Sequence, residues 1–514
     1  MLKRHLIFFA ALLLCACDTL SSPTATPTVT PSATATVTLT ASPTVTATAT
    51  VTATATASPT VTETPTVTPT STITPTPFNT PLPVPNLFFD NWNVITVPEE
   101  LQAGLNRPLI AFVNQNNSET IRNLSTAQPP TNRETLYFAS PRNPADRLTV
   151  LELEATTGSQ VYVAPRGNAV AYFVEGLSGV SGLYVLNVPV GLSGRILALE
   201  SLTQRGIFSA PAWSPDGQIL AVTVETGYSL DILGFNMADS QWLQIVRDGA
   251  FNFWPAWSPD GRYLAFVSDR ATCPTWEASQ PGACDPAVDP LPIGGQLYVY
   301  EIATGTITQL SEEFTGEPPR WINSDLIAFT GGDRFDLLNP SRTLWVADVR
   351  TGGAREVTMT GDPDGQLHLS ETWSQTGGRV VFQNATNGNQ ITVMDANGTP
   401  LAMLEDLAFA RFAMSAAWSP DGTRLAIGGS GGQCPYGVRV FDENYGRVAA
   451  GNPPPSMCDP QFSPDGQFIT FTGVNPSRAD GRADIYTSSA NGFDMINLTA
   501  DLRGQQTLLG WVSP

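Results

Sequence analysis

From about residue 107 onward, the chain alternates apolar and polar residues in short runs separated by turn residues. Typical runs are QILAVTV at 218–224, RYLAFVS at 262–268 and QFITFTG at 467–473. A period of two residues places successive side chains on opposite faces of the backbone, so each run predicts a strand. Gly, Asn, Asp or Pro bounds each run, and no long stretch has the period of a helix. The pattern therefore predicts an all-β domain.

One hexapeptide recurs along this domain, as AWSPDG at 212–217, 256–261 and 417–422 and, nearly unchanged, as QFSPDG at 461–466. Within it, SPDG predicts a turn, because proline fixes φ and glycine accepts positive φ. The interval from Trp213 to Trp257 is near the length of a four-stranded β-propeller blade, about 40–45 residues. The equivalent positions of successive repeats are Pro165, Trp213, Trp257, Trp321, Trp373, Trp418, Phe462 and Trp511.

The two ends of the chain carry complementary parts of one repeat. LLGWVSP at 508–514 matches an opening strand, whereas RPLIAFVNQ at 107–115, TLYFAS at 135–140 and RLTVLELE at 147–154 match later strands. We therefore expect a closing blade built from both termini, which would leave no open sheet edge. With seven further repeats, this predicts a β-propeller of eight four-stranded blades, or of seven if the unit at Pro165 is not a blade.

Residues 1–16 have the features of a secretory signal peptide. A basic pair precedes the apolar run IFFAALLL at 7–14, which is too short to span a bilayer. The run leads into LCAC at 14–17, which resembles the lipobox of bacterial lipoproteins. The resemblance implies that Cys17 is acylated and becomes the mature N-terminus. The lipid would then be the chain's membrane anchor.

Residues 17–85 consist almost wholly of Thr, Pro, Ala, Val and Ser. Such a segment lacks the large apolar side chains that offset the entropy of ordering a core, so we expect a disordered stalk. Ser/Thr-Pro tracts of this kind are typical of O-glycosylated stalks. The predicted organisation is a signal peptide at 1–16, a stalk at 17–85 and a propeller at 86–514.

Three features together resemble a known repeat. They are the strand after AWSPDG, a second strand that ends near a Gly, Asn or Asp turn, and a short third strand. They resemble the WD-like propeller repeat of TolB-type periplasmic proteins and of prolyl oligopeptidase relatives. The resemblance covers about 107–514 and is strongest at 212–267 and 417–473. It departs at 321–325 and 373–377, where the Pro-Asp turn is absent, and in having more blades than TolB.

The hexapeptide itself is interpreted as architecture rather than as a ligand site. Its aromatic residue is expected to fill the space between blades, and its aspartate to bond backbone amides of the turn. These structural repeat residues are Trp213, Asp216, Trp257, Asp260, Trp418, Asp421, Phe462 and Asp465.

Four cysteines follow the signal region, and they are expected to form disulfides because the chain has an export signal. Cys273 and Cys284 lie in an insertion at 271–295, whereas Cys434 and Cys458 flank one blade. Of the three possible pairings, proximity favours 273–284 and 434–458. A zinc site is disfavoured, since the sequence has no CxxC and only one histidine after the signal.

Candidate catalytic residues are few. Lys3 is the chain's one lysine and His368 its one histidine after the signal, so a Ser-His-Asp triad would require His368. The GxSxG at 428–432 precedes no predicted helix and is interpreted as a blade loop. Asp362 and Asp364 could contribute to a Ca²⁺ site, but GDPDG predicts a turn. We therefore expect no catalytic residues, no metal and no cofactor, with Ca²⁺ as the alternative considered.

The net charge of −20 limits the partners. Nucleic acid and anionic membrane surfaces should repel the domain. We therefore predict a monomeric, non-enzymatic module at the cell envelope that binds a protein, peptide or glycan, with the Trp276-bearing insertion as candidate recognition loop. The alternative function is a carbohydrate hydrolase or lyase with carboxylates at the propeller channel.

Overall fold

The structure is a computed structural model, and it describes residues 87–116, 132–155, 160–174, 181–198, 209–332, 343–357, 368–384, 390–404, 414–430, 434–448, 455–475 and 481–514. All of these residues belong to a compact unit at 71–514. The predicted signal peptide, Cys17 and the whole of the predicted stalk lie outside the described residues. Within the described ranges, no helix is both long enough and apolar enough to cross a membrane.

The described chain is almost entirely β, with one short helix, α1 (Glu99–Gln102). The first sheet has the order β1 (Leu87–Val94), β8 (Leu192–Ala198), β7 (Gly182–Asn187), β6 (Ala169–Val174) and β5 (Val161–Val163). The second has the order β12 (Gln241–Val246), β11 (Ser229–Asn236), β10 (Ile219–Thr226) and β9 (Ala212–Trp213). The third has the order β13 (Asn252–Trp257), β14 (Tyr263–Ser268), β15 (Gln296–Glu301) and β16 (Ile307–Gln309).

Further sheets follow the same pattern. One has the order β17 (Arg320–Trp321), β18 (Leu326–Gly331), β19 (Thr343–Asp348) and β20 (Gly353–Glu356). The next has the order β21 (His368–Trp373), β22 (Arg379–Asn384), β23 (Gln390–Asp395) and β24 (Pro400–Met403). A larger sheet runs β25 (Met414–Trp418), β26 (Leu425–Gly429), β28 (Cys458–Phe462), β29 (Phe468–Val474), β30 (Ala483–Ser489) and β31 (Ile496–Asn497), with β27 (Val440–Phe441) also paired to β26.

One sheet combines strands from opposite ends of the described chain. Its order is β32 (Gln505–Val512), β2 (Leu109–Asn116), β3 (Asn132–Ala139) and β4 (Arg147–Ala155). The register pairs Leu109 with Val512 and Gln115 with Gln505 in an antiparallel ladder. The last strand of the chain therefore occupies the opening position of a sheet whose other strands come from its beginning.

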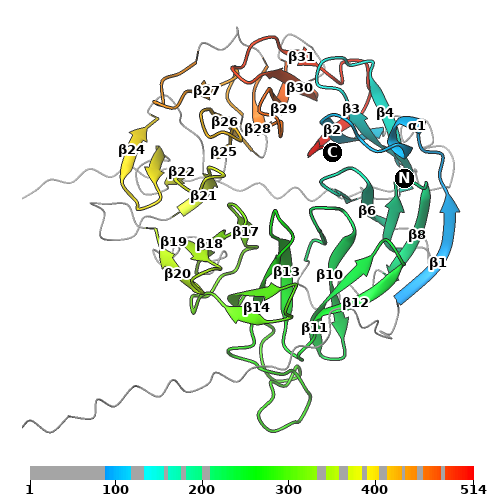
Figure 1. The fold of residues 1–514 in the computed structure, drawn as a ribbon, viewed down its shortest axis with the longest axis vertical. Helices are drawn as coiled ribbons and strands as arrows, with labels where there is room; N and C mark the ends of the chain where they lie inside the picture. Colours follow the sequence, from blue (N-terminus) through cyan, green and yellow to red (C-terminus); the bar gives the residue numbers. More distant parts are fainter. Residues whose placement is uncertain are drawn as a thin grey trace, which may run out of the picture. The chain divides into compact units, whose positions relative to one another are not determined.

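The sheets follow one another in chain order within this unit (Figure 1). β5 contacts β9, β9 contacts β13 and β13 contacts β17, while β21 contacts β25 and β25 contacts β28. β32 contacts both β30 and β5. This serial packing of antiparallel sheets is the arrangement of a β-propeller.

The number of blades depends on how the largest sheet is divided. Its two parts, β25–β27 and β28–β31, are joined through a single parallel pair between Gly429 and Cys458. Counting these parts separately would give eight blades. The eight-blade count and the full closure of the ring stay predictions.

The repeated turn has a defined hydrogen-bond pattern. Asp216 Oδ1 accepts from the Ser214 hydroxyl at 2.6 Å and from the backbone N–H of Gln218 at 3.0 Å. Gly217 has φ of 68°, a conformation that disfavours any residue with a Cβ. Aspartates at the same position of other repeats accept equivalent bonds, namely Asp260, Asp421 and Asp465.

Indole N–H groups connect neighbouring sheets. The Nε1 of Trp257 donates to the Ala212 carbonyl at 3.1 Å, and that of Trp321 donates to the Ala256 carbonyl at 2.8 Å. The same kind of bond joins Trp213 to Tyr162, Trp418 to Thr372 and Trp511 to Gln461. Phe462 occupies the equivalent position without an N–H to donate. The tryptophan of the repeat thus forms a hydrogen bond to the neighbouring sheet as well as filling the space between the two sheets.

Both disulfides join cysteines that are close in sequence. Cys273 pairs with Cys284, and Cys434 pairs with Cys458. The first lies within the 271–295 insertion between β14 and β15. The second ties the segment after β26 to the start of β28.

Candidate functional site

The opening strands of the sheets line several pockets. One, of about 280 Å³, has a mainly apolar lining that includes Tyr162 and Trp213. Another, of about 550 Å³, is lined by hydroxyl and amide side chains and by Asp459, which has a positive φ of 47° and a pKa raised by burial. A third, of about 520 Å³, lies between β17 and β21 and contains an ion pair.

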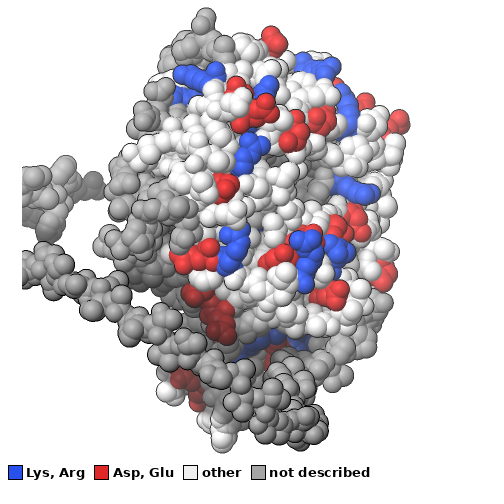
Figure 2. Space-filling model, turned by 60° about the vertical axis from the view of Figure 1, so that its left-hand side comes forward, with Lys and Arg blue, Asp and Glu red and all other residues white. Residues whose placement is uncertain are grey.

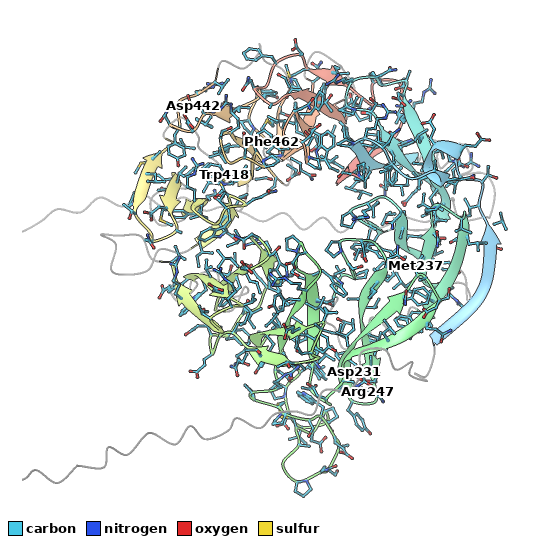
Figure 3. The ribbon with its side chains drawn as sticks, in the orientation of Figure 1. Asp231, Met237, Arg247, Trp418, Asp442 and Phe462 are labelled. Carbon is cyan, nitrogen blue, oxygen red and sulfur yellow. A yellow bond between two sulfur atoms is a disulfide. The ribbon has the colours of Figure 1, made fainter. Side chains whose placement is uncertain are left out.

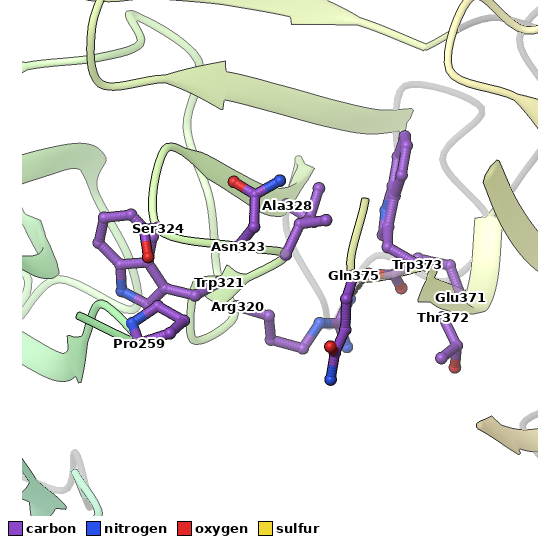
Figure 4. A pocket seen from close by; sticks show the side chains of 11 residues that line it. Pro259, Arg320, Trp321, Asn323, Ser324, Ala328, Glu371, Thr372, Trp373 and Gln375 are labelled. Carbon is purple, nitrogen blue, oxygen red and sulfur yellow. Dashed lines mark hydrogen bonds and ion pairs between the residues drawn. The ribbon is translucent and has the colours of Figure 1, made fainter. Parts of the chain in front are cut away.

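The pocket between β17 and β21 is formed by the two repeats that lack the Pro-Asp turn. Residues 321–324 line one side and Trp373 and Gln375 line the other (Figure 4). In place of the aspartate turn, Asn323 Oδ1 accepts from the backbone N–H groups of Asp325 at 2.9 Å and Leu326 at 3.0 Å. The two departures from the repeat are therefore neighbours in space.

Arg320 and Glu371 line this pocket, one from each strand, and their side chains are in direct contact. The guanidinium donates to Glu371 Oε1, and the glutamate side chain is only 1% exposed whereas that of the arginine is 52% exposed. A buried carboxylate requires such a partner, because removing an ionised group from water is unfavourable. The ion pair thus fixes the guanidinium at the pocket wall.

Two indole rings also line the pocket. Trp321 is held by its bond to the Ala256 carbonyl and by Tyr263, which stacks on its ring with centroids 6.4 Å apart. Trp373 differs, because its buried Nε1 has no hydrogen-bond partner among the described residues. The acceptor in the equivalent place would be the carbonyl of Arg320, the residue just before Trp321.

A buried acidic residue lies at the outer part of the second sheet. Asp231, on β11, accepts from the Thr226 hydroxyl, and its Oδ2 is 3.2 Å from the guanidinium of Arg247 (Figure 3). Burial raises the pKa of Asp231 to about 7, even though the Thr226 bond and Arg247 lower it. The carboxyl therefore titrates near neutral pH.

The insertion at 271–295 is fixed to the third sheet by a second buried acid. Asp269 Oδ2 accepts from the Trp276 indole at 2.8 Å, and Oδ1 accepts from the Phe251 N–H at 2.9 Å. Burial raises the pKa of Asp269 to about 6. Trp276 is only 4% exposed and stacks on Phe251, with centroids 4.9 Å apart.

Trp276 lies inside the insertion that the sequence offers as a candidate recognition loop. The structure buries its ring as the anchor of that loop. The exposed apolar side chains of the insertion are instead Val288, Leu291 and Ile293. Sequence reasoning missed this because Phe251 and Asp269, which hold the ring, lie outside the insertion.

Other sequence candidates are not assembled into a site. His368 begins β21, and Gly428 and Gly429 end β26, whereas Asp362, Asp364 and the last two glycines of the GxSxG lie outside the described residues. Among the described residues, no group of three or more His, Cys, Asp or Glu side chains could hold a metal ion. Sequence reasoning also missed Arg320 and Glu371, although the changed turns beside them were visible.

Charged residues on the described surface are mixed. Figure 2 shows basic and acidic side chains interspersed on the face that it presents. Several form ion pairs, such as Arg107 with Asp146 at 2.7 Å and Arg147 with Asp501 at 2.5 Å.

The fold and the repeats define a β-propeller, and comparison with known proteins gives its type. Residues 146–276, which include the repeats of Trp213 and Trp257, match the family model described as TolB beta propeller domain. The repeats within residues 146–276 are therefore of the TolB type. No curated protein matches the chain.

The solved structures that match this chain share little sequence with it. TolB from Acinetobacter baumannii is 19% identical over 57% of this chain and 62% of its own, with a TM-score of 0.32. An oligogalacturonate lyase from Vibrio parahaemolyticus is 12% identical over 77% and 98%, with a TM-score of 0.41. Dipeptidyl peptidase 4 from Porphyromonas gingivalis is 12% identical over 80% and 63%, with a TM-score of 0.47. The match thus spans about 62% of the TolB structure's length.

Proposed function

We propose that this chain is a non-enzymatic binding module, a TolB-type propeller anchored outside the cytoplasmic membrane through lipid on Cys17. Its partner is an envelope protein, and the binding surface is the 271–295 insertion. Paired cysteines and the N-terminal signal pattern support an extracytoplasmic location.

The observation that carries the proposal is a loop that is both rigid and apolar at its surface. Val288 is 80% exposed, and Leu291 and Ile293 are exposed beside it. The Cys273–Cys284 disulfide and the buried Trp276 hold the base of this loop. A preformed loop loses little conformational entropy on binding, which favours recognition.

The loop also has a defined local fold near its exposed end. Asp285 accepts from the backbone N–H groups of Ser279 and Ala287, both at 2.9 Å, and its own N–H donates to Asp289 Oδ2 at 2.8 Å. The segment 271–295 contains acidic residues but no Lys or Arg. Charge complementarity therefore favours a partner segment with apolar side chains flanked by basic ones.

The experiment uses the full-length chain as bait on detergent-solubilised envelope. A triple variant, Val288→Ser with Leu291→Ser and Ile293→Ser, should lose a partner that the unmodified chain retains, because it removes the apolar surface that the partner would bury. The matched control replaces three other exposed apolar residues by serine: Val190, Leu401 and Met403. Equal recovery of the partner by the loop variant would contradict the proposed surface.

The geometry gives no specific support to the carbohydrate hydrolase or lyase alternative. That chemistry uses two carboxyl groups that face each other across a bound sugar. Each of the three pockets described above is lined by at most one carboxylate, Glu371 in one and Asp459 in another. We propose no second function.

A further inference from the structure

We propose that the pocket between β17 and β21 binds a small organic carboxylate. Its carboxylate group would accept hydrogen bonds from Arg320, and its apolar part would lie against the indoles of Trp321 and Trp373. This site is separate from the 271–295 loop, so it does not depend on the protein partner proposed above.

Arg320 supplies the positive charge. A guanidinium carries five N–H donors, and the one hydrogen bond described for Arg320 goes to Glu371 Oε1. The arginine side chain is 52% exposed, whereas the Glu371 side chain is 1% exposed. The glutamate thus holds the guanidinium in place while most of its N–H groups remain for a ligand.

The nearby amides add further donors. Asn323 lines the pocket, and its Oδ1 is already occupied by the backbone N–H groups of Asp325 and Leu326. Its Nδ2 is therefore the group left for a ligand. Gln375 lines the opposite side and can present either end of its amide.

The pocket lies where the indole hydrogen bond that joins other neighbouring sheets has no counterpart among the described residues. Trp418 donates to the Thr372 carbonyl at 3.0 Å, and the residue in the acceptor place for Trp373 is Arg320. The Trp373 Nε1 has no partner among the described residues, and a pocket of about 520 Å³ separates the two strands. Its indole ring and that of Trp321 form walls suited to an apolar group.

The donor set favours a carboxylate over other charged ligands. Among the described residues of the pocket's lining, Arg320 and Glu371 are the only charged ones, and the glutamate is already neutralised by the arginine. A cation would therefore meet the guanidinium, and a doubly charged phosphate would find only one base. The planar fork of arginine matches the two oxygens of a carboxylate.

The test measures affinity for matched small molecules by isothermal titration calorimetry on the full-length chain. Benzoate should bind at millimolar or lower concentration, and benzamide, its neutral analogue, should bind about tenfold weaker or worse, because charge-assisted hydrogen bonds are lost. Acetate should also bind more weakly than benzoate, since it cannot cover the indoles. Comparing the affinity of glucuronate with that of benzoate tests whether the natural ligand is a sugar acid or an aromatic acid. Tighter binding of either compound supports a carboxylate site.

Two variants locate the binding. Arg320→Gln with Glu371→Gln removes the cation without leaving a buried charge, and should weaken benzoate binding about tenfold or more. The matched control, Arg107→Gln with Asp146→Asn, removes a surface ion pair on another sheet and should leave the affinity unchanged.

A second, gentler variant covers the case in which the double variant does not fold. Asn323→Asp keeps the oxygen that caps the turn but replaces the donor by a negative oxygen, so benzoate should bind less tightly. Unchanged benzoate affinity in these variants, equal binding of benzamide, or no binding of any carboxylate at millimolar concentration would overturn the proposal.

Discussion

At the residue scale, Asp231 shows how burial changes a common side chain. Its carboxyl is 1% exposed, next to the Thr226 hydroxyl and 3.2 Å from Arg247. Because desolvation disfavours the charged form, the pKa rises to about 7 from an ordinary value of 3.8. The folded state therefore binds a proton, between about pH 4 and 7, that the unfolded chain releases.

This proton predicts a pH-dependent stability. The contribution of Asp231 to the free energy of unfolding should fall as pH rises through this interval and be lost above about pH 7. Asp231→Asn removes the titration, so the stability of the variant relative to that of the unmodified chain should rise between about pH 4 and 7 and stay constant above about pH 7. Chemical denaturation across that range measures the difference.

The matched control is Asp239→Asn, at the exposed turn between β11 and β12. It replaces a carboxylate by an amide at an exposed position, so it separates the effect of burial from that of the substitution itself. If the stability of Asp231→Asn stayed parallel to that of the unmodified chain at every pH, Arg247 would be holding the Asp231 carboxylate ionised throughout.

At the scale of elements, the indole bonds fasten one sheet to the next. Each of these bonds satisfies a carbonyl on an opening strand, as Trp257 does for Ala212. Buried carbonyl groups that lose their donor are unfavourable by about 1–3 kcal/mol. Trp373 occupies the same position of its repeat, but its indole N–H has no hydrogen-bond partner among the described residues. It therefore serves as the reference for a tryptophan without this bond.

Two aromatic substitutions test how much the indole hydrogen bond between sheets contributes to stability. Trp257→Phe should lower the free energy of unfolding by about 1–3 kcal/mol more than Trp373→Phe, because only the first removes a made hydrogen bond. Both changes remove the same volume from a half-buried site, so the loss of packing is matched. Urea denaturation at constant pH gives both values, and equal losses would show that packing alone holds the sheets together.

The sequence predicted these elements better than it predicted the site between them. The SPDG turns and the alternating runs give the strands directly, because both signals are local. Pairing of β1 with β8 was not foreseen, since six strands, β2 to β7, lie between the LFFDNWNV segment and its partner in the chain. Arg320 and Glu371 are 51 residues apart, and nothing local in either segment reveals that they meet. Contacts between sheets depend on the three-dimensional arrangement, which no periodic pattern encodes.

At the scale of the whole molecule, one sheet links the start of the domain to its end. β32 pairs with β2 along its length, and Gln506 donates to Asn114 Oδ1 at 2.6 Å from a buried position. Trp511 also reaches the Gln461 carbonyl of the neighbouring sheet. Removal of β32 would therefore expose the edge of β2 and take away a contact to the preceding sheet.

This arrangement predicts the effect of a truncation. Deletion of residues 505–514 should leave a chain that self-associates, because an open apolar strand edge pairs with other chains. Light scattering during size-exclusion chromatography would detect the larger species. A synthetic peptide of residues 505–514 should restore the monomer, whereas a scrambled peptide should not. A truncated chain that stayed monomeric without peptide would show that β32 is not needed to protect β2.

The pairing of β2 with β32 also affects how the chain folds during its synthesis. Asn114 and Gln506 are 392 residues apart, and contacts so distant form slowly because a long loop must close first. Synthesis at about 5–20 residues per second means that roughly 20–80 s pass between the emergence of the two strands. Whatever handles the nascent chain must keep the edge of β2 away from other strands for that interval.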